Sequence, residues 1–154
     1  MEDQLLDTWN IHSRISLYLL DSVPAEALEA APGSKGRSAG EMFAHINNVR
    51  LMWLQAAAPE LAQEVSKVDK EAAQQKEVLN ASLQASARSI GLLLAKGIEA
   101  GGKIKGFKPH ATAFLGYLIS HESYHIGEIG VALGQAGHPL DKKVAYGIWE
   151  WGVR

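Results

Sequence analysis

Apolar residues recur at steps of three and four in four separate segments of this 154-residue chain, which is the spacing of one face of an α-helix. The segments cover residues from about 4 to 20, 38 to 58, 79 to 98 and 109 to 136. No stretch alternates between apolar and polar residues with turn residues on both sides, as a half-buried strand would. The pattern predicts an all-α fold, an up-and-down four-helix bundle, in a single domain over residues 1–154.

Turn-forming residues and helix-start signals separate these segments. Residues 31–37 are rich in glycine, proline and serine and predict a loop after the first helix. Ser38 is followed three positions later by Glu41, which predicts a capping box at the start of the second helix, and Pro59 punctuates its end. Gly101 and Gly102 predict the end of the third helix, and Pro109 is a good first-turn residue for the fourth.

The last segment, residues 140–154, follows the fourth helix and is rich in aromatic residues. It contains Tyr146, Trp149 and Trp151. Large aromatic side chains bury much apolar surface when they pack. The segment therefore predicts a short aromatic cap that packs onto the bundle.

The composition excludes several classes of protein. A formal net charge of -2 leaves no broad positive field for phosphate backbones, so we expect no nucleic-acid partner. The chain has no cysteine, which excludes disulfides and thiolate metal sites and is compatible with the cytoplasm. It starts with an acidic, polar stretch and has no apolar run of the roughly 20 residues that cross a bilayer. We expect a cytoplasmic protein that does not bind membranes.

Three histidines form the candidate metal site. His121 and His125 are four residues apart, so on a helix they lie one above the other and can bind one cation together. His45 falls on the inward side of the second helix. Three neutral imidazoles from two helices suit a divalent transition metal and leave coordination positions open. The alternative is that these are core histidines satisfied by hydrogen bonds.

Two motifs around these histidines resemble a known family, the DinB/YfiT-like superfamily of metal-dependent enzymes. They cover residues 36–45 and 121–128, and the resemblance extends over nearly the whole chain. In that family a histidine of the second helix and a His-x-x-x-His pair of a later helix ligate a divalent metal, most often nickel or zinc. These positions correspond to His45, His121 and His125, and the continuation of the pair matches as well.

The resemblance also implies a class of activity. Members of the superfamily are four-helix bundles, often dimeric, and some transfer or isomerise substrates with a low-molecular-weight thiol while others are described as hydrolases. We therefore expect a homodimeric metal-dependent enzyme that acts on a small-molecule substrate, as a hydrolase or as a thiol S-transferase. A non-catalytic metal-containing binding or stress-response bundle is the alternative.

Residues 121–125 also spell H-E-x-x-H, the helix motif of zinc proteases, in which the glutamate is the general base. Such a protease needs a further ligand downstream, and Val131 stands where the extended motif has histidine. It also normally binds its substrate along a sheet edge, and no strand is predicted. The protease is the less favoured alternative.

Three further residues are weak candidates for a catalytic role: Glu128, Glu122 and His12. Glu128 lies three residues after His125 and is expected to accept a hydrogen bond from that ring or to reach the open coordination positions. Glu122 is rotated about 100° from His121 and is expected to be a solvated or interhelical charge rather than a base. His12 lies on the apolar stripe of the first helix, where a core histidine is favoured over an acid or base of the same cavity.

Four other side chains are candidate neighbours of the site. Asn48, one turn after His45, is a candidate for orienting that ligand or a bound water, or a plain surface amide. Trp9, Trp53 and Tyr124 either wall a substrate pocket or belong to the core, and helical spacing favours the core.

Overall fold

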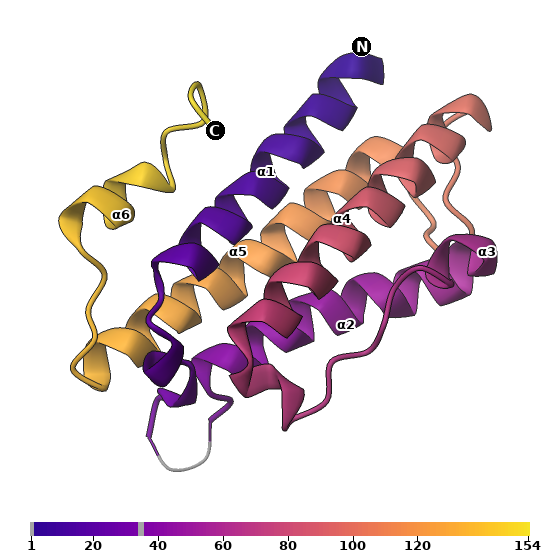
Figure 1. The fold of residues 1–154 in the computed structure, drawn as a ribbon. Coiled ribbons are helices and arrows are strands. Elements are labelled where there is room, and N and C mark those ends of the chain that lie inside the picture. The colour runs from indigo at the N-terminus through magenta and orange to yellow at the C-terminus, as the bar shows by residue number, and fades with distance from the viewer. Residues whose placement is uncertain (1, 34–35) are drawn as a thin grey trace.

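The computed structural model describes residues 2–33 and 36–154, and its regular elements over these residues are all helices (Figure 1). The predicted helical segments are each present. None of the helices in this part of the chain is long and apolar enough to cross a membrane. The four long helices are α1 (Glu2–Ser22), α2 (Ala39–Ala57), α4 (Lys76–Glu99) and α5 (Ala111–Gln135). The short elements are η1 (Ala25–Glu29), α3 (Pro59–Ala62), η2 (Ala72–Gln74) and α6 (Lys142–Gly147).

The local signals start the helices where the pattern predicts. Ser38 caps α2: its side chain accepts from the Glu41 amide at 3.2 Å, and its own amide donates to the Glu41 carboxylate at 3.4 Å. The predicted capping box is therefore confirmed. The start of α5 lies slightly later than predicted from Pro109. His110 is the N-cap, its Nδ1 accepts from the amide of Ala113, and the helix begins at Ala111. Part of the predicted loop over residues 31–37, positions 34 and 35, lies outside the described residues.

The long helices do not alternate in direction, so the predicted up-and-down order is wrong (Figure 1). One apolar cluster joins the last turns of α1 and α5 to the first turns of α2 and α4, and a second cluster joins their opposite ends. The chain therefore runs one way in α1 and α5 and the other way in α2 and α4. The contacts of α2 with η2 and α4 agree with this course. The hydrogen-bonded pairs Ser38–Gln74 and Arg50–Leu83 have similar sequence separations, 36 and 33 residues, as is expected when two segments run in the same direction.

The connection between α2 and α4 is the reason for this order. Residues 58–75 return along α2 instead of turning back at once, and Asn48 holds them by donating to the carbonyl and accepting from the amide of Val68, both at 2.9 Å. At the end of the return, Gly40 lies so close to η2 that an added Cβ would come within 2.1 Å of the Ala73 carbonyl oxygen. Helical periodicity indicates which residues face inward, but it is the same for either direction of a helix, so it could not predict this order.

Between the two apolar clusters lies a layer of buried polar side chains. It includes His12, Arg50, Ser86 and Glu122, each at most 2% exposed. Burying such groups costs free energy unless each finds a partner. This layer lies next to the histidines of the candidate site along α2 and α5.

The C-terminal segment packs on the bundle, but not through the side chains that were expected. Val144 and Ile148 contact the first apolar cluster, whereas Tyr146 is 72% and Trp149 is 76% exposed. Residues four apart share one helix face, so the apolar pair of α6 turns inward and the aromatic residues turn to solvent. Trp151 is also exposed, at 37%. The C-terminal segment therefore packs on the bundle through Val144 and Ile148, and its aromatic rings are exposed.

Candidate metal centre

His45 of α2 and His121 and His125 of α5 meet in the structure. One ring nitrogen of each can be chosen so that all three nitrogens lie within 4.8 Å of one another. The ring centroids are 5.3 Å apart for His45 and His121, 4.6 Å for His45 and His125, and 4.7 Å for the α5 pair. The residues that the sequence singles out are thus brought together, from two antiparallel helices.

Two of the three rings have a lowered pKa that leaves a nitrogen lone pair free to coordinate a metal. Burial, followed by the positive charge of Arg37 and the neighbouring rings, lowers the pKa of His45 to about 4. Burial and the ring of His125 lower the pKa of His121 as well. These two imidazoles are therefore neutral at pH 7 and keep the lone pair that a metal ligand needs.

The hydrogen bonds of the α5 pair fit a metal site. His125 Nδ1 lies 2.7 Å from Glu128 Oε1, so that nitrogen donates to the carboxylate and the other, Nε2, presents its lone pair. This is the contact predicted for Glu128. His125 Nε2 and His121 Nε2 are 3.2 Å apart. Two nitrogens bound to one zinc ion in tetrahedral geometry lie about 3.3 Å apart, so the spacing fits a shared ion.

The other ring nitrogen of His121 counts against the alternative that these are hydrogen-bonded core histidines. His121 Nδ1 is buried and has no hydrogen-bond partner among the described residues. A buried histidine that serves only the core normally has its ring nitrogens satisfied. The histidines therefore fit a divalent metal better than they fit a hydrogen-bonded core.

Glu122 and His12 lie in the interior and not at the histidine cluster. Glu122 Oε1 accepts from Arg50 Nε at 2.7 Å, and Oε2 accepts from Arg50 Nη2 and faces His12 Nε2, both at 2.8 Å. Arg50 Nη1 also donates to the carbonyl of Leu83 and to the hydroxyl of Ser86. This network joins α1, α2, α4 and α5. Glu122 is thus the interhelical charge that was expected, and His12 is a buried core histidine.

Arg50 is the important residue that the sequence reasoning missed. It falls four residues after Ile46 and four before Leu54, on an apolar stripe of α2. A charged residue on such a stripe is rarely buried without a partner. That position in the pattern is the signal that predicts an ion pair with a buried carboxylate.

The same network makes Glu122 unsuitable as a general base. Burial by itself raises the pKa of Glu122, but the charge and hydrogen bonds of Arg50 and the hydrogen bond of His12 outweigh it and lower the pKa to about 2. Its two oxygens are occupied by partners in the interior. The described residues also contain no strand to hold a peptide. The geometry does not support the H-E-x-x-H protease alternative.

The other candidate neighbours of the site lie in different surroundings: a backbone contact, the core and the surface. The amide of Asn48 is used by the backbone of Val68 and does not orient His45. Trp9 is fully buried and donates to the carbonyl of Ala87, so it belongs to the core. Tyr124 is exposed and lies against the edge of the His125 ring, with centroids 5.3 Å apart. The half-buried Trp53 packs in an aromatic cluster with Phe107, Phe114 and Tyr117.

Two pockets lie beside the histidine cluster, one lined by His45 and the other by Glu128, the partner of His125. The first, of about 230 Å³, is lined by His45, Arg37, Asn48 and Lys70 and also by Glu41 and Asp69. A second pocket of about 80 Å³ lies between Arg37 and Glu128. Both are small compared with sites for drug-sized molecules.

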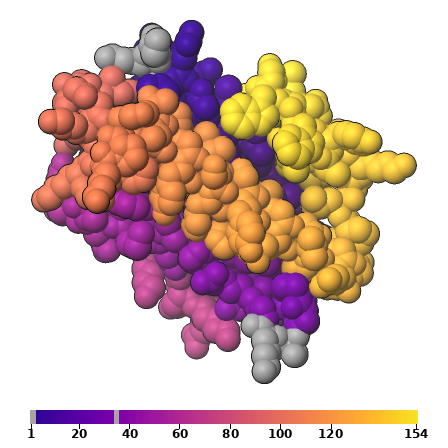
Figure 2. All heavy atoms as spheres, turned by 180° about the vertical axis from the view of Figure 1, so that it is seen from behind, coloured from indigo at the N-terminus to yellow at the C-terminus, as the bar shows by residue number. Residues whose placement is uncertain are grey.

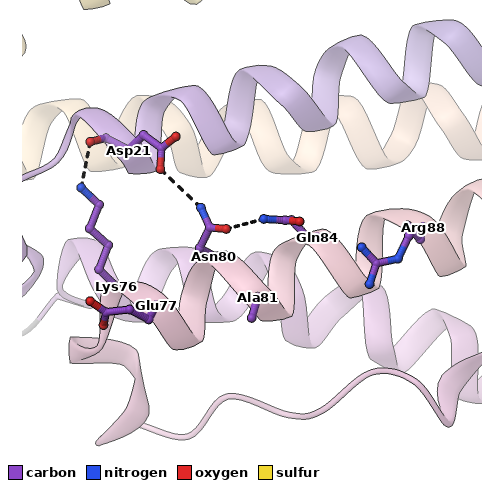
Figure 3. Close-up of a pocket in the computed structure, with 7 residues that line it drawn as sticks. All are labelled: Asp21, Lys76, Glu77, Asn80, Ala81, Gln84 and Arg88. Carbon is purple, nitrogen blue, oxygen red and sulfur yellow. Dashed lines mark hydrogen bonds between the residues drawn. The ribbon is translucent and has the colours of Figure 1, made fainter.

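A larger pocket of about 540 Å³ lies between α1 and α4, away from the histidines (Figure 3). Four of its lining residues are paired with one another: Lys76 donates to the carbonyl of Asp21, and Asn80 bridges the Asp21 carboxylate and Gln84. It contains none of the three histidines. We assign it no chemistry.

The model of the DinB family matches residues 1–142, a stretch that contains the four long helices and the three clustered histidines. The chain belongs to the DinB family. Neither the curated proteins nor the solved structures contain a match to this sequence. Membership of the DinB family leaves the reaction to be inferred from the site.

Proposed function

We propose that this DinB-family protein is a metal-dependent enzyme that holds one divalent transition metal, nickel or zinc, through His45, His121 and His125. The observation that supports it is the convergence of three histidine nitrogens, one from each ring, within 4.8 Å of one another. Nitrogen ligands accept several first-row ions, so the cell's metal supply contributes to the choice.

The surrounding residues support a reaction on a small molecule. A bound divalent metal with three protein ligands supplies a Lewis acid that lowers the pKa of a water or thiol at an open position. Glu128 holds the His125 ring in the tautomer that presents Nε2, and the pocket beside His45 admits a small substrate. Hydrolysis of an activated ester or amide and transfer of a low-molecular-weight thiol both fit this arrangement, in a cytoplasmic setting.

Elemental analysis tests the metal site. The wild type and the variants His45→Ala, His121→Ala and His125→Ala are purified without a nickel column, with His138→Ala, an exposed histidine outside the cluster, as the matched control. We expect about one equivalent of metal in the wild type and the control, and little in the three variants. A wild type that contains no metal and takes up none on reconstitution contradicts the proposal.

Activity assays separate the reaction classes in metal-loaded protein. Consumption of a thiol with a generic electrophile supports the S-transferase, and ester cleavage without thiol supports the hydrolase. The non-catalytic alternative has one structural argument, because ligands from both α2 and α5 allow a metal to cross-link two helices. It is favoured if metal raises the melting temperature while both assays stay at background.

The enzyme is further proposed to be a homodimer that pairs through α5. This helix runs across the surface beside the C-terminal segment (Figure 2), and all of its exposed residues are uncharged, among them Tyr117, Tyr124 and Val131. Such a face meets a second copy without charge repulsion. We expect Val131→Asp to yield a monomer by light scattering, and Leu92→Asp, equally exposed at 55% on α4, to have no effect. A monomeric wild type contradicts this proposal.

A further inference from the structure

Arg37 occupies a position shared by both pockets at the histidine cluster. It lines the larger one together with His45 and Lys70, and the smaller one together with Glu128. The residue immediately precedes Ser38, whose capping box fixes the start of α2. A well-defined helix start thus places Arg37 at both pockets.

The side chains of Arg37 and Lys70 make no hydrogen bond or ion pair with the residues that the structure describes. The carboxylates nearby have other partners: Glu41 accepts from the amide of Ser38, and Asp69 accepts from the amide of Ala72. Two cationic side chains therefore remain available to a ligand in the pocket.

A cation in this position opposes the binding of a metal ion. Arg37 lines the same pocket as His45, which places its positive charge within electrostatic reach of an ion held by that ring. The neutral imidazoles bring no negative charge, so a divalent ion held by them keeps its charge of +2. An anionic group between the ion and Arg37 would offset this repulsion.

We propose that the substrate carries a small oxyanion, a carboxylate or a phosphate, which Arg37 and Lys70 bind in the pocket beside His45. The planar guanidinium of Arg37 offers two parallel donors to such a group. The volume of about 230 Å³ limits the bound part to a small group. This inference rests on the proposed metal site and names the class of its substrate.

Calorimetric titration of zinc-loaded protein with inorganic phosphate and, separately, with acetate tests the proposal. The variants are Arg37→Gln and Lys70→Gln, and Arg88→Gln, which removes the same charge from the pocket between α1 and α4, is the matched control. We expect each of the first two to weaken binding of the preferred anion by about tenfold, the size of one lost charge-assisted hydrogen bond, and the control to have no effect. The probe that binds more tightly identifies the anionic group.

Zinc affinity in anion-free buffer provides a second readout, because Arg37→Gln should not weaken zinc binding although it weakens anion binding. Arg37→Gln removes a repelling charge, so zinc should bind as tightly as in the wild type or more tightly while the anion binds more weakly. Zinc uptake with unchanged anion affinity in Arg37→Gln overturns the oxyanion proposal alone. A wild type that takes up no zinc overturns the proposed function and this proposal with it.

Discussion

Replacing Glu122 by glutamine should destabilise the protein strongly, although the side chain keeps its size and shape. Glu122 is 1% exposed and Arg50 is 1% exposed, so Glu122→Gln leaves a buried guanidinium without its counter-charge. Breaking a buried ion pair from one side costs about 3–5 kcal/mol. This is a large part of the roughly 5–15 kcal/mol that holds a typical domain folded.

The lowered pKa of Glu122 gives a similar magnitude for the free energy of unfolding that the ion pair contributes. Its decrease from 4.5 to about 2 in the folded state corresponds to about 3 kcal/mol of stability at neutral pH. Because the folded-state pKa is the lower one, this stability is present above pH 4.5 and is lost as the pH falls towards 2. The wild type and Glu122→Gln should therefore differ most at neutral pH and converge in acid.

Urea unfolding of metal-free protein, followed by circular dichroism at pH 7 and at pH 3, measures both effects. The control is the double variant Arg50→Met with Glu122→Leu, which replaces the pair by apolar side chains and should recover most of the lost stability. A loss below about 1 kcal/mol in Glu122→Gln at pH 7, or a double variant as unstable as the single one, would refute the reasoning.

Three further outcomes are expected. Gly40→Ala should lower the melting temperature, at a cost of about 1–3 kcal/mol, because its Cβ would collide with the Ala73 carbonyl, whereas Gly91→Ala meets only ordinary contacts and should not. Metal-free protein should lose stability as the pH falls from 6.5 to about 4, since the folded-state pKa of His45 is lowered; His45→Asn should reduce that loss in urea titrations at several pH values. Glu128→Gln should weaken zinc binding about tenfold in a chelator competition while the fold is retained.

Local chemistry explains what the sequence by itself determined. The steps of three and four place apolar residues on one helical face whatever the neighbouring helices do, so the helices and most of the buried residues could be predicted. The capping box of Ser38 and Glu41 is formed within one turn and was predictable for the same reason. His121 and His125 are also a local pair, because four residues bring two side chains together on any helix.

The tertiary structure alone decided how these local units combine. Periodicity is the same for a helix read in either direction, so the parallel course of α2 and α4 depended on the path of residues 58–75, which Asn48 secures. The hydrogen-bond partners of Arg50 come from two other helices, α4 and α5, and no local pattern connects residues 72 positions apart in the sequence. His45 joins the α5 pair for the same physical reason: long-range contacts depend on how whole helices pack, and only the folded chain specifies that packing.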